Sequence, residues 1–153
     1  MGWRVASSVG AQQFIQAEPA SRVGLIQVLA DMRAWLQSSD LSVREFETNL
    51  QGALDALARH DWSNEEKLRS ELERQGQEYC DSGLGLVRED GRILHVCPGG
   101  ETSVVHFHRP VKRLGFLWQR SAVLSQPSMP SSSLPELVRY FFEQKDHLLE
   151  RIG

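Results

Sequence analysis

The first half of the chain carries apolar residues at helical spacing. Over residues 19–37 they recur every three or four positions, which predicts an amphipathic helix that ends at the polar residues 38–40. A second apolar stripe covers about residues 43–57, and Ser42 and Glu45 stand at its start with the spacing of a capping box. Two amphipathic helices with so short a connection are expected to pack as an antiparallel hairpin.

A third helix is predicted from Ser63 to about Cys80. Ser63 precedes Glu66 at the spacing of another capping box, and the apolar stripe that follows is thin. Residues 61–81 hold seven acidic residues against three basic ones. This pattern is typical of a solvated outer helix rather than of a ligand site.

Near position 82 the period of the apolar residues changes from 3.6 to two, which predicts β-strands. The pair Asp90-Gly91 favours a two-residue type I′ turn, and the run Pro98–Glu101 provides a second turn. The resulting strands cover residues 84–89, 92–97, 102–108 and about 113–124. We therefore expect an antiparallel meander of three or four strands.

Residues 125–133 read as a loop, because their Pro and Ser residues disfavour regular structure. A last helix is predicted from about Ser133, with Glu136 at capping-box spacing and Pro135 in the first turn. Its broad apolar face is suited either to close over the sheet or to dock onto a second subunit.

Taken together, the pattern predicts one α+β domain over residues 1–153, in which residues 1–18 are weakly patterned. N-terminal helices, the central meander and a C-terminal helix packed on the sheet would share one core. The chain's 153 residues, 41% of them hydrophobic, are typical of such a domain.

Composition narrows the possible functions. A formal net charge of −3 disfavours nucleic-acid binding, because neutralising phosphates requires an excess of Lys and Arg. The two cysteines, Cys80 and Cys97, lack CxxC spacing, which indicates free thiols in a reducing compartment. Residues 1–16 lack the apolar core of a signal peptide, and the apolar-rich stretch 23–30 is too short to cross a bilayer. We expect a cytoplasmic protein without membrane contact.

The strands around the second turn concentrate candidate chemistry. If Cys97 lies opposite Thr102, side chains alternate so that four potential metal ligands share one face. These ligands are His95, Cys97, His106 and His108. Imidazole and thiolate bind zinc, so the face is a candidate metal site. A bulged turn would send one pair to the opposite face, and polar residues on the less buried side of a sheet are the simpler interpretation.

A second candidate surface combines basic and aromatic residues. Residues 106–120 contain four Lys or Arg residues and no acid, with aromatic residues between them. Such a patch suits an anionic small molecule or an acidic protein partner, since Arg presents a planar fork of donors, whereas single-stranded nucleic acid is a weaker alternative. The candidates for lining a ligand pocket between sheet and helices are His95, His106, His108, Arg109, Arg113 and Trp118.

The sequence contains no Walker A motif, G-x-S-x-G elbow or H-E-x-x-H motif, and nothing marks either cysteine as an activated nucleophile. We therefore expect a non-enzymatic binding or interaction module without a cofactor, which self-associates or binds a protein partner. Two alternatives stay open. One is a protein or enzyme that binds an anionic small molecule between sheet and helices, and the other is a metal protein that uses the His and Cys residues named above.

Overall fold

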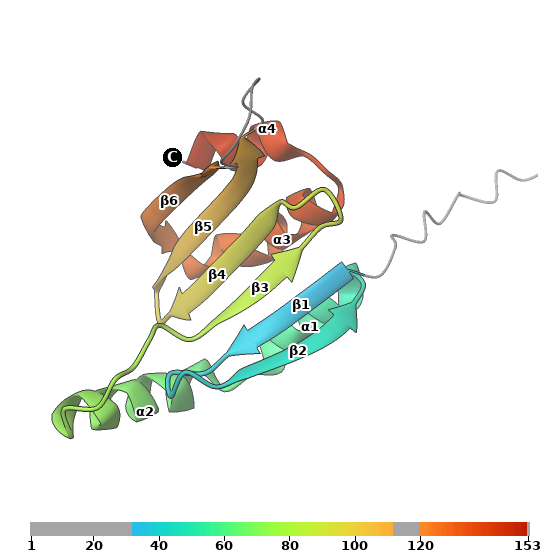
Figure 1. The fold of residues 1–153 in the computed structure, drawn as a ribbon. Coiled ribbons are helices and arrows are strands. Elements are labelled where there is room, and N and C mark those ends of the chain that lie inside the picture. The colour runs from blue at the N-terminus through green and yellow to red at the C-terminus, as the bar shows by residue number, and fades with distance from the viewer. Residues whose placement is uncertain (1–31, 112–119, 153) are drawn as a thin grey trace, which may run out of the picture.

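A sheet of six antiparallel strands forms the centre of the fold, and helices cover one of its faces (Figure 1). The computed structural model describes residues 32–111 and 120–152. Its strands are β1 Met32–Gln37, β2 Val43–Thr48, β3 Gly83–Val87, β4 Ile93–Gly99, β5 Thr102–Val111 and β6 Arg120–Pro130. Its helices are α1 Leu50–Arg59, α2 Trp62–Arg74, η1 Ser131–Ser133, α3 Leu134–Phe142, α4 Asp146–Leu149 and η2 Glu150–Ile152.

The strands lie in the order β2-β1-β3-β4-β5-β6, and each neighbouring pair is antiparallel. The α+β class predicted from the sequence is therefore confirmed. The predicted sheet of three or four strands is too small, because β1 and β2 were expected to be helical.

The first predicted helix is wrong where the structure describes it. Residues 32–37 form β1, while residues 19–31 lie outside the described part of the chain. In β1, Ala34 and Leu36 point into the core, whereas Trp35 lies on the opposite face over a glycine of β3. Apolar residues on both faces of a strand produce three- and four-residue spacings that resemble a helical stripe.

The capping box at Ser42 and Glu45 does not start a helix either. Both residues belong to the β1–β2 hairpin, where the carboxylate of Asp40 accepts hydrogen bonds from the backbone and hydroxyl of Ser42. Helix α1 begins later, after Asn49, whose Oδ1 accepts a hydrogen bond from Gly52 N at 2.9 Å. Asn is among the preferred N-cap residues, so the local signal was present but further along the chain.

The predicted third helix overlaps α2, which is shorter than expected. Asp61 rather than Ser63 caps its start, with its Oδ1 accepting from Asn64 N at 3.0 Å. At its end Gly76 adopts a φ of +68°, and Gln77 N donates to Leu72 O at 2.9 Å. This is a Schellman arrangement, which explains why the helix stops at the glycine instead of continuing to Cys80.

The two predicted hairpins of the meander are present, each with altered geometry. In the β3–β4 turn only Gly91 of the Asp90-Gly91 pair has a positive φ, so the loop is a three-residue type with a left-handed glycine, not type I′. In the β4–β5 hairpin Thr102 lies opposite Gly99, not Cys97. This shift moves the register by an even number of residues, so every side chain keeps the face expected for it.

Strand β6 runs through most of the segment that was predicted to be a loop. It extends to Pro130, whereas residues 112–119 of the predicted fourth strand lie outside the described residues. A proline has no N–H to donate to a neighbouring strand, so it is tolerated where no such bond is needed. Within the described residues β6 lies at the edge of the sheet, and Pro127 falls within an interruption of the β5–β6 ladder. Helix α3 then starts close to the predicted position, although Ser133 forms no side-chain cap.

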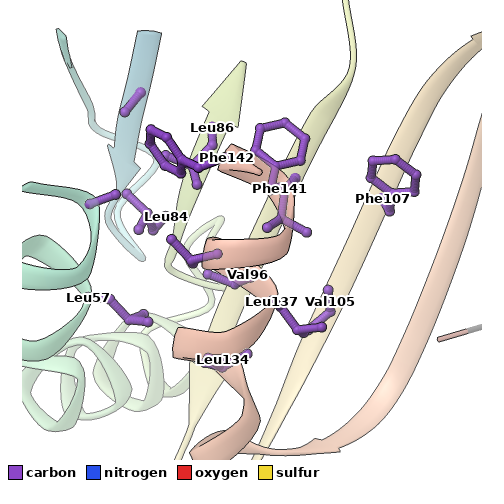
Figure 2. Packing of buried hydrophobic residues seen from close by; sticks show 14 of the residues in the cluster. Leu57, Leu84, Leu86, Val96, Val105, Phe107, Leu134, Leu137, Phe141 and Phe142 are labelled. Atoms are coloured by element: carbon purple, nitrogen blue, oxygen red, sulfur yellow. The ribbon is translucent and has the colours of Figure 1, made fainter. Parts of the chain in front are cut away.

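The hydrophobic core lies between the covered face of the sheet and helices α1 and α3 (Figure 2). Phe107 of β5 meets Phe141 of α3 edge to face, with ring centroids 6.3 Å apart. The core also includes Ala53, Leu57, Leu84, Leu86, Leu94, Val96, Val105, Leu134, Leu137, Val138, Phe142 and Leu149. The opposite face of β3, β4 and β5 holds none of the core residues of the described part of the chain, and we call it the open face.

A buried arginine joins the β3–β4 turn to the C-terminal helices. Arg88 is 6% exposed, and its guanidinium donates to both carboxylate oxygens of Asp146, at 2.9 Å each, and to Asp90. The same group lies 5.0 Å from the ring centroid of Phe141. Burial alone would lower the pKa of Arg88, but its two carboxylate partners raise it above the usual value, so the side chain is always charged.

None of the helices formed by residues 32–111 and 120–152 has both the length and the apolar character needed to cross a bilayer.

Candidate functional site

A row of aromatic and imidazole rings crosses the open face of the sheet. Trp35, Gly85, His95 and His106 are successive cross-strand partners on β1, β3, β4 and β5. The ring centroids of Trp35 and His95 are 5.8 Å apart, and those of His95 and His106 are 5.9 Å apart with nearly parallel planes. His108 follows at 6.4 Å from His106. The alternation of side chains across strands therefore gathers the three histidines on one surface.

Two glycines of β3 make room for this row. A Cβ at Gly85 would lie 2.1 Å from ring atoms of Trp35, so the indole covers the position where a side chain would stand. A Cβ at Gly83 would lie 2.6 Å from His95 Nε2 and 3.1 Å from Cys97 Sγ. The contacts of 2.1 Å and 2.6 Å are too short for a Cβ unless the neighbouring ring moves. Because β3 has no side chain at these two positions, Trp35 and His95 can approach each other across it.

His95, Cys97 and His106 form a compact cluster at the centre of the row. Cys97 Sγ lies 3.7 Å from His95 Nε2 and 3.8 Å from His95 Nδ1. One potential ligand atom from each of the three residues lies within 4.8 Å of the other two. The cysteine is buried and the two imidazoles are half-buried, so the cluster belongs to the body of the sheet rather than to a loop.

The surroundings of the cluster change the pKa values of its members. Burial, and then the charges of His106 and His108, lower the pKa of His95 to about 4. Burial, and then the charges of Asp81 and Cys80, raise the pKa of Cys97 to about 12. At neutral pH His95 is thus a neutral imidazole and Cys97 a protonated thiol. A thiol in this state is a poor nucleophile, which argues against covalent catalysis by this pair.

Arg109, the other predicted ligand residue that the structure describes, does not join the histidines. Arg109 follows Phe107 on the covered side of β5, and its guanidinium pairs with Glu150 at 2.7 Å. Arg113 and Trp118 lie outside the described residues. Of the six residues proposed from the sequence, the structure brings together His95, His106 and His108, and their role as ligand contacts stays a prediction.

A cleft of about 900 Å³ opens where α1 and α2 meet the ends of β4 and β5 and the start of α3. Its floor is apolar, with Leu54, Leu57, Trp62 and Leu134. Its polar lining includes Ser39, Gln51, Asp55, Glu66, Arg69, Asp81, Ser82 and Ser103. Of the predicted ligand residues that the structure describes, His95, His106, His108 and Arg109, none lines the cleft, whereas their neighbour Cys97 does.

The charged groups of the cleft are mostly acidic. Arg69 pairs with Asp81 at 2.9 Å, and Asp55 lies 3.5 Å from Arg59 outside the cleft. Glu66 forms no ion pair within the described part of the chain. The cleft therefore offers unbalanced negative charge above an apolar floor.

A buried carboxylate fixes one wall of this cleft. Glu65, at 7% exposure, accepts hydrogen bonds from Ser39 N at 2.9 Å and from the Ser38 hydroxyl, and His60 Nε2 lies 3.3 Å away. Burial alone would raise the pKa of Glu65, but these hydrogen bonds and His60 lower it below its usual value. The ionised side chain thereby ties α2 to the β1–β2 turn.

Little in the sequence indicates the cleft, because the cleft is assembled from the ends of elements far apart in the chain. Its one local signal was Trp62, a large aromatic residue at the start of an acidic helix. The indole Nε1 donates to Leu57 O at 2.8 Å, which fixes the ring between α1 and α2.

In comparisons with known proteins, no protein family, curated protein or solved structure matches this chain. Its function is therefore argued from its own residues.

Proposed function

We propose that the protein is a non-enzymatic binding module, which holds a small molecule with a positively charged group and an apolar body in the cleft described above. The observation that carries the proposal is the combination of a volume of about 900 Å³ with an apolar floor and an acidic lining. Small-molecule sites have volumes of roughly 300–1,000 Å³ and combine apolar walls with a few polar groups.

The charges of the lining favour a cation over the anionic ligand considered from the sequence. Among the described lining residues there are three acids, Asp55, Glu66 and Asp81, and one base, Arg69. Arg69 already pairs with Asp81, and Asp55 pairs with Arg59 outside the cleft, which leaves Glu66 without an ion pair in the described part of the chain. Trp62 adds an aromatic ring, and aromatic rings attract ammonium and guanidinium groups through their negative faces. An anion would meet repulsion from the acids and find its potential partner occupied.

Binding rather than catalysis is favoured by the groups that the cleft lacks. Among the described residues that line it there is no histidine to act as a general base for its serine hydroxyls. The single thiol, Cys97, keeps its proton at neutral pH because its pKa is about 12.

The test is a thermal-shift screen with pairs of compounds that differ only in one charged group, an amine against a carboxylate on the same apolar scaffold. A ligand that binds only the folded protein raises its Tm. We expect the amines and not the carboxylates to do so. Carboxylates that stabilise as strongly as their amine counterparts, or no stabilising amine in the series, would refute the proposal.

Two pairs of variants locate the binding. Glu66→Gln should weaken amine binding about tenfold, as expected for the loss of one charge-assisted hydrogen bond, whereas Glu73→Gln, on the exposed side of the same helix, should not. Ala58→Trp should fill the cleft and abolish binding, and Ser70→Trp on exposed α2 surface should preserve it. Binding that survives Ala58→Trp would place the ligand elsewhere.

We also propose self-association through the edge strand β2. Leu41 and Val43 are 46% and 54% exposed beside this edge, and β2 has a partner strand on one side only among the described residues. An unpaired edge with apolar side chains is a template for a second strand. Light scattering should report a dimer that Val43→Lys converts to a monomer, while the control Tyr79→Lys, at another exposed apolar position, stays dimeric. A wild-type monomer would refute this.

A further inference from the structure

We propose that His95, Cys97 and His106 bind one zinc ion on the open face of the sheet, with a fourth coordination position left for water. Cys97 also lines the cleft, but His95 and His106 do not, so the proposal does not depend on a ligand bound there. Two imidazole nitrogens and one thiolate match the ligand preferences of zinc, and three protein ligands are typical of zinc sites with an open position.

The distances between the ligand atoms fit this coordination. Zinc bonds of about 2.0 Å to nitrogen and 2.3 Å to sulfur place tetrahedral ligand atoms roughly 3.5 Å apart. The 3.7 Å between Cys97 Sγ and His95 Nε2 is already close to that value. All three ligand atoms lie within 4.8 Å of one another, so closing the site requires side-chain shifts of no more than about 1 Å and no movement of the strands.

The backbone positions of the ligands are fixed by the sheet. His95 and Cys97 are two residues apart on β4 and share a face, and His106 is the direct cross-strand partner of His95 on β5. Gly83 leaves room for the ligands, since a Cβ there would lie 2.6 Å from His95 Nε2 and 2.7 Å from the backbone oxygen of Val96. Trp35 supports the His95 ring from the other side. A site built on strands with packed side chains is preorganised for its ion.

The ligands also lack stronger partners. Within the described residues the only hydrogen-bonding partner of the His95 ring nitrogens is Cys97 Sγ, a weak acceptor at 3.7–3.8 Å. Asp81, which pairs with Arg69, lies near enough for its charge to act on both His95 and Cys97. On zinc binding, the thiol proton of Cys97 passes to solvent and a thiolate–zinc bond forms.

His108 is not included among the ligands. It lies on the same face, but its ring centroid is 6.4 Å from that of His106, on the side away from Cys97. Cys80 is likewise near Cys97 without belonging to the cluster, and its sulfur donates to Ser38 O at 3.3 Å. These two residues provide matched controls, a histidine and a cysteine close to the site.

The experiment uses the full chain, purified without a histidine tag and without chelators. Elemental analysis is expected to find one zinc per chain. After removal of the metal, titration with Co²⁺ should produce the visible bands of tetrahedral cobalt and a thiolate-to-cobalt charge-transfer band, and zinc should displace both. A folded protein that holds no zinc and gives no charge-transfer band, or one that takes up copper and not zinc, overturns the proposal.

Variants identify the ligands. Cys97→Ser should abolish the charge-transfer band, and His106→Ala should weaken cobalt binding at least tenfold. Cys80→Ser and His108→Ala should bind as the wild type does. Circular dichroism checks that each variant is folded. If replacement of the buried Cys97 prevents folding, cobalt binding by the variant of the half-buried His106 still tests the assignment. Equal loss in Cys80→Ser and Cys97→Ser, or full binding by folded His106→Ala, would overturn the assignment.

Discussion

Protonation of His95 should destabilise the metal-free protein in mildly acidic solution. Burial, followed by the charges of His106 and His108, lowers the pKa of this imidazole from 6.5 to about 4. In the unfolded chain the same group takes up a proton near pH 6.5, so the unfolded state binds more protons between these two values. The free energy of unfolding therefore falls as the pH drops from about 6.5 to about 4, and the full stability is present above 6.5.

The size of the effect follows from the difference between the two pKa values. A pKa lowered from 6.5 to about 4 corresponds to a loss of about 3 kcal/mol across this pH range. Marginal stabilities of 5–15 kcal/mol are ordinary for domains, so a loss of roughly 3 kcal/mol is large enough to measure by urea denaturation.

The assay compares wild type with His95→Gln in a series of urea denaturations from pH 7.5 to 4.5, with a chelator present. The variant should lose much less stability than the wild type over this range, whatever its stability at pH 7.5. His147→Gln, a control at an exposed position of α4, should keep the wild-type dependence. Parallel loss in wild type and His95→Gln, or an NMR titration that places the His95 midpoint between pH 6 and 7, would refute the reasoning.

Three further predictions concern stability. Asp146→Ala should cost roughly 3 kcal/mol, because it leaves the buried guanidinium of Arg88 with one carboxylate fewer. Gly85→Ala should cost roughly 1–3 kcal/mol and quench or shift the fluorescence of Trp35, because the new methyl group must displace the indole. Glu65→Gln should destabilise the protein near pH 7 but leave the variant less sensitive to acid, since a lowered carboxylate pKa contributes stability above pH 4.5 that is lost as the pH falls through the folded value.

Urea denaturation and thermal unfolding measure the stability of all three variants. A different result would contradict the prediction for each one. Asp146→Ala would contradict the importance of the buried pair if it cost no more than Glu71→Ala, which breaks an exposed pair with Arg74. For Gly85→Ala, an unchanged Tm and unchanged fluorescence would show that the indole does not cover the glycine. For Glu65→Gln, an acid dependence equal to that of the wild type would be the contrary result.

The sequence predicted the central hairpins because their signals are local. Alternating apolar residues and the turn glycines Gly91 and Gly99-Gly100 define the strands, and an even error in register left His95, Cys97 and His106 on one face. The β1–β2 hairpin was mistaken for helices because Trp35 is apolar on the open face, where its partner is a glycine distant in sequence. No pattern within residues 32–48 shows that contact.

The other errors also have non-local causes. Strand β6 tolerates prolines because it lies at the edge of the sheet, a position that depends on the order of all six strands. The cleft depends on how α1 and α2 meet the ends of β4 and β5, and its lining comes from residues 39 to 135. Periodicity identifies which face of an element is buried, but it does not identify the elements that meet there.

The absence of side chains at Gly83 and Gly85 makes β1 and β4 neighbours in packing although β3 separates them in hydrogen bonding. A substitution at Trp35 therefore changes the packing of the His95 ring directly, and not through side chains of the intervening strand. The two positions should be energetically coupled, so that the effects of replacing both do not add. At these two positions strand β3 contributes only backbone to the surface, and related chains that enlarge either glycine should carry a smaller residue in place of the tryptophan or the imidazole.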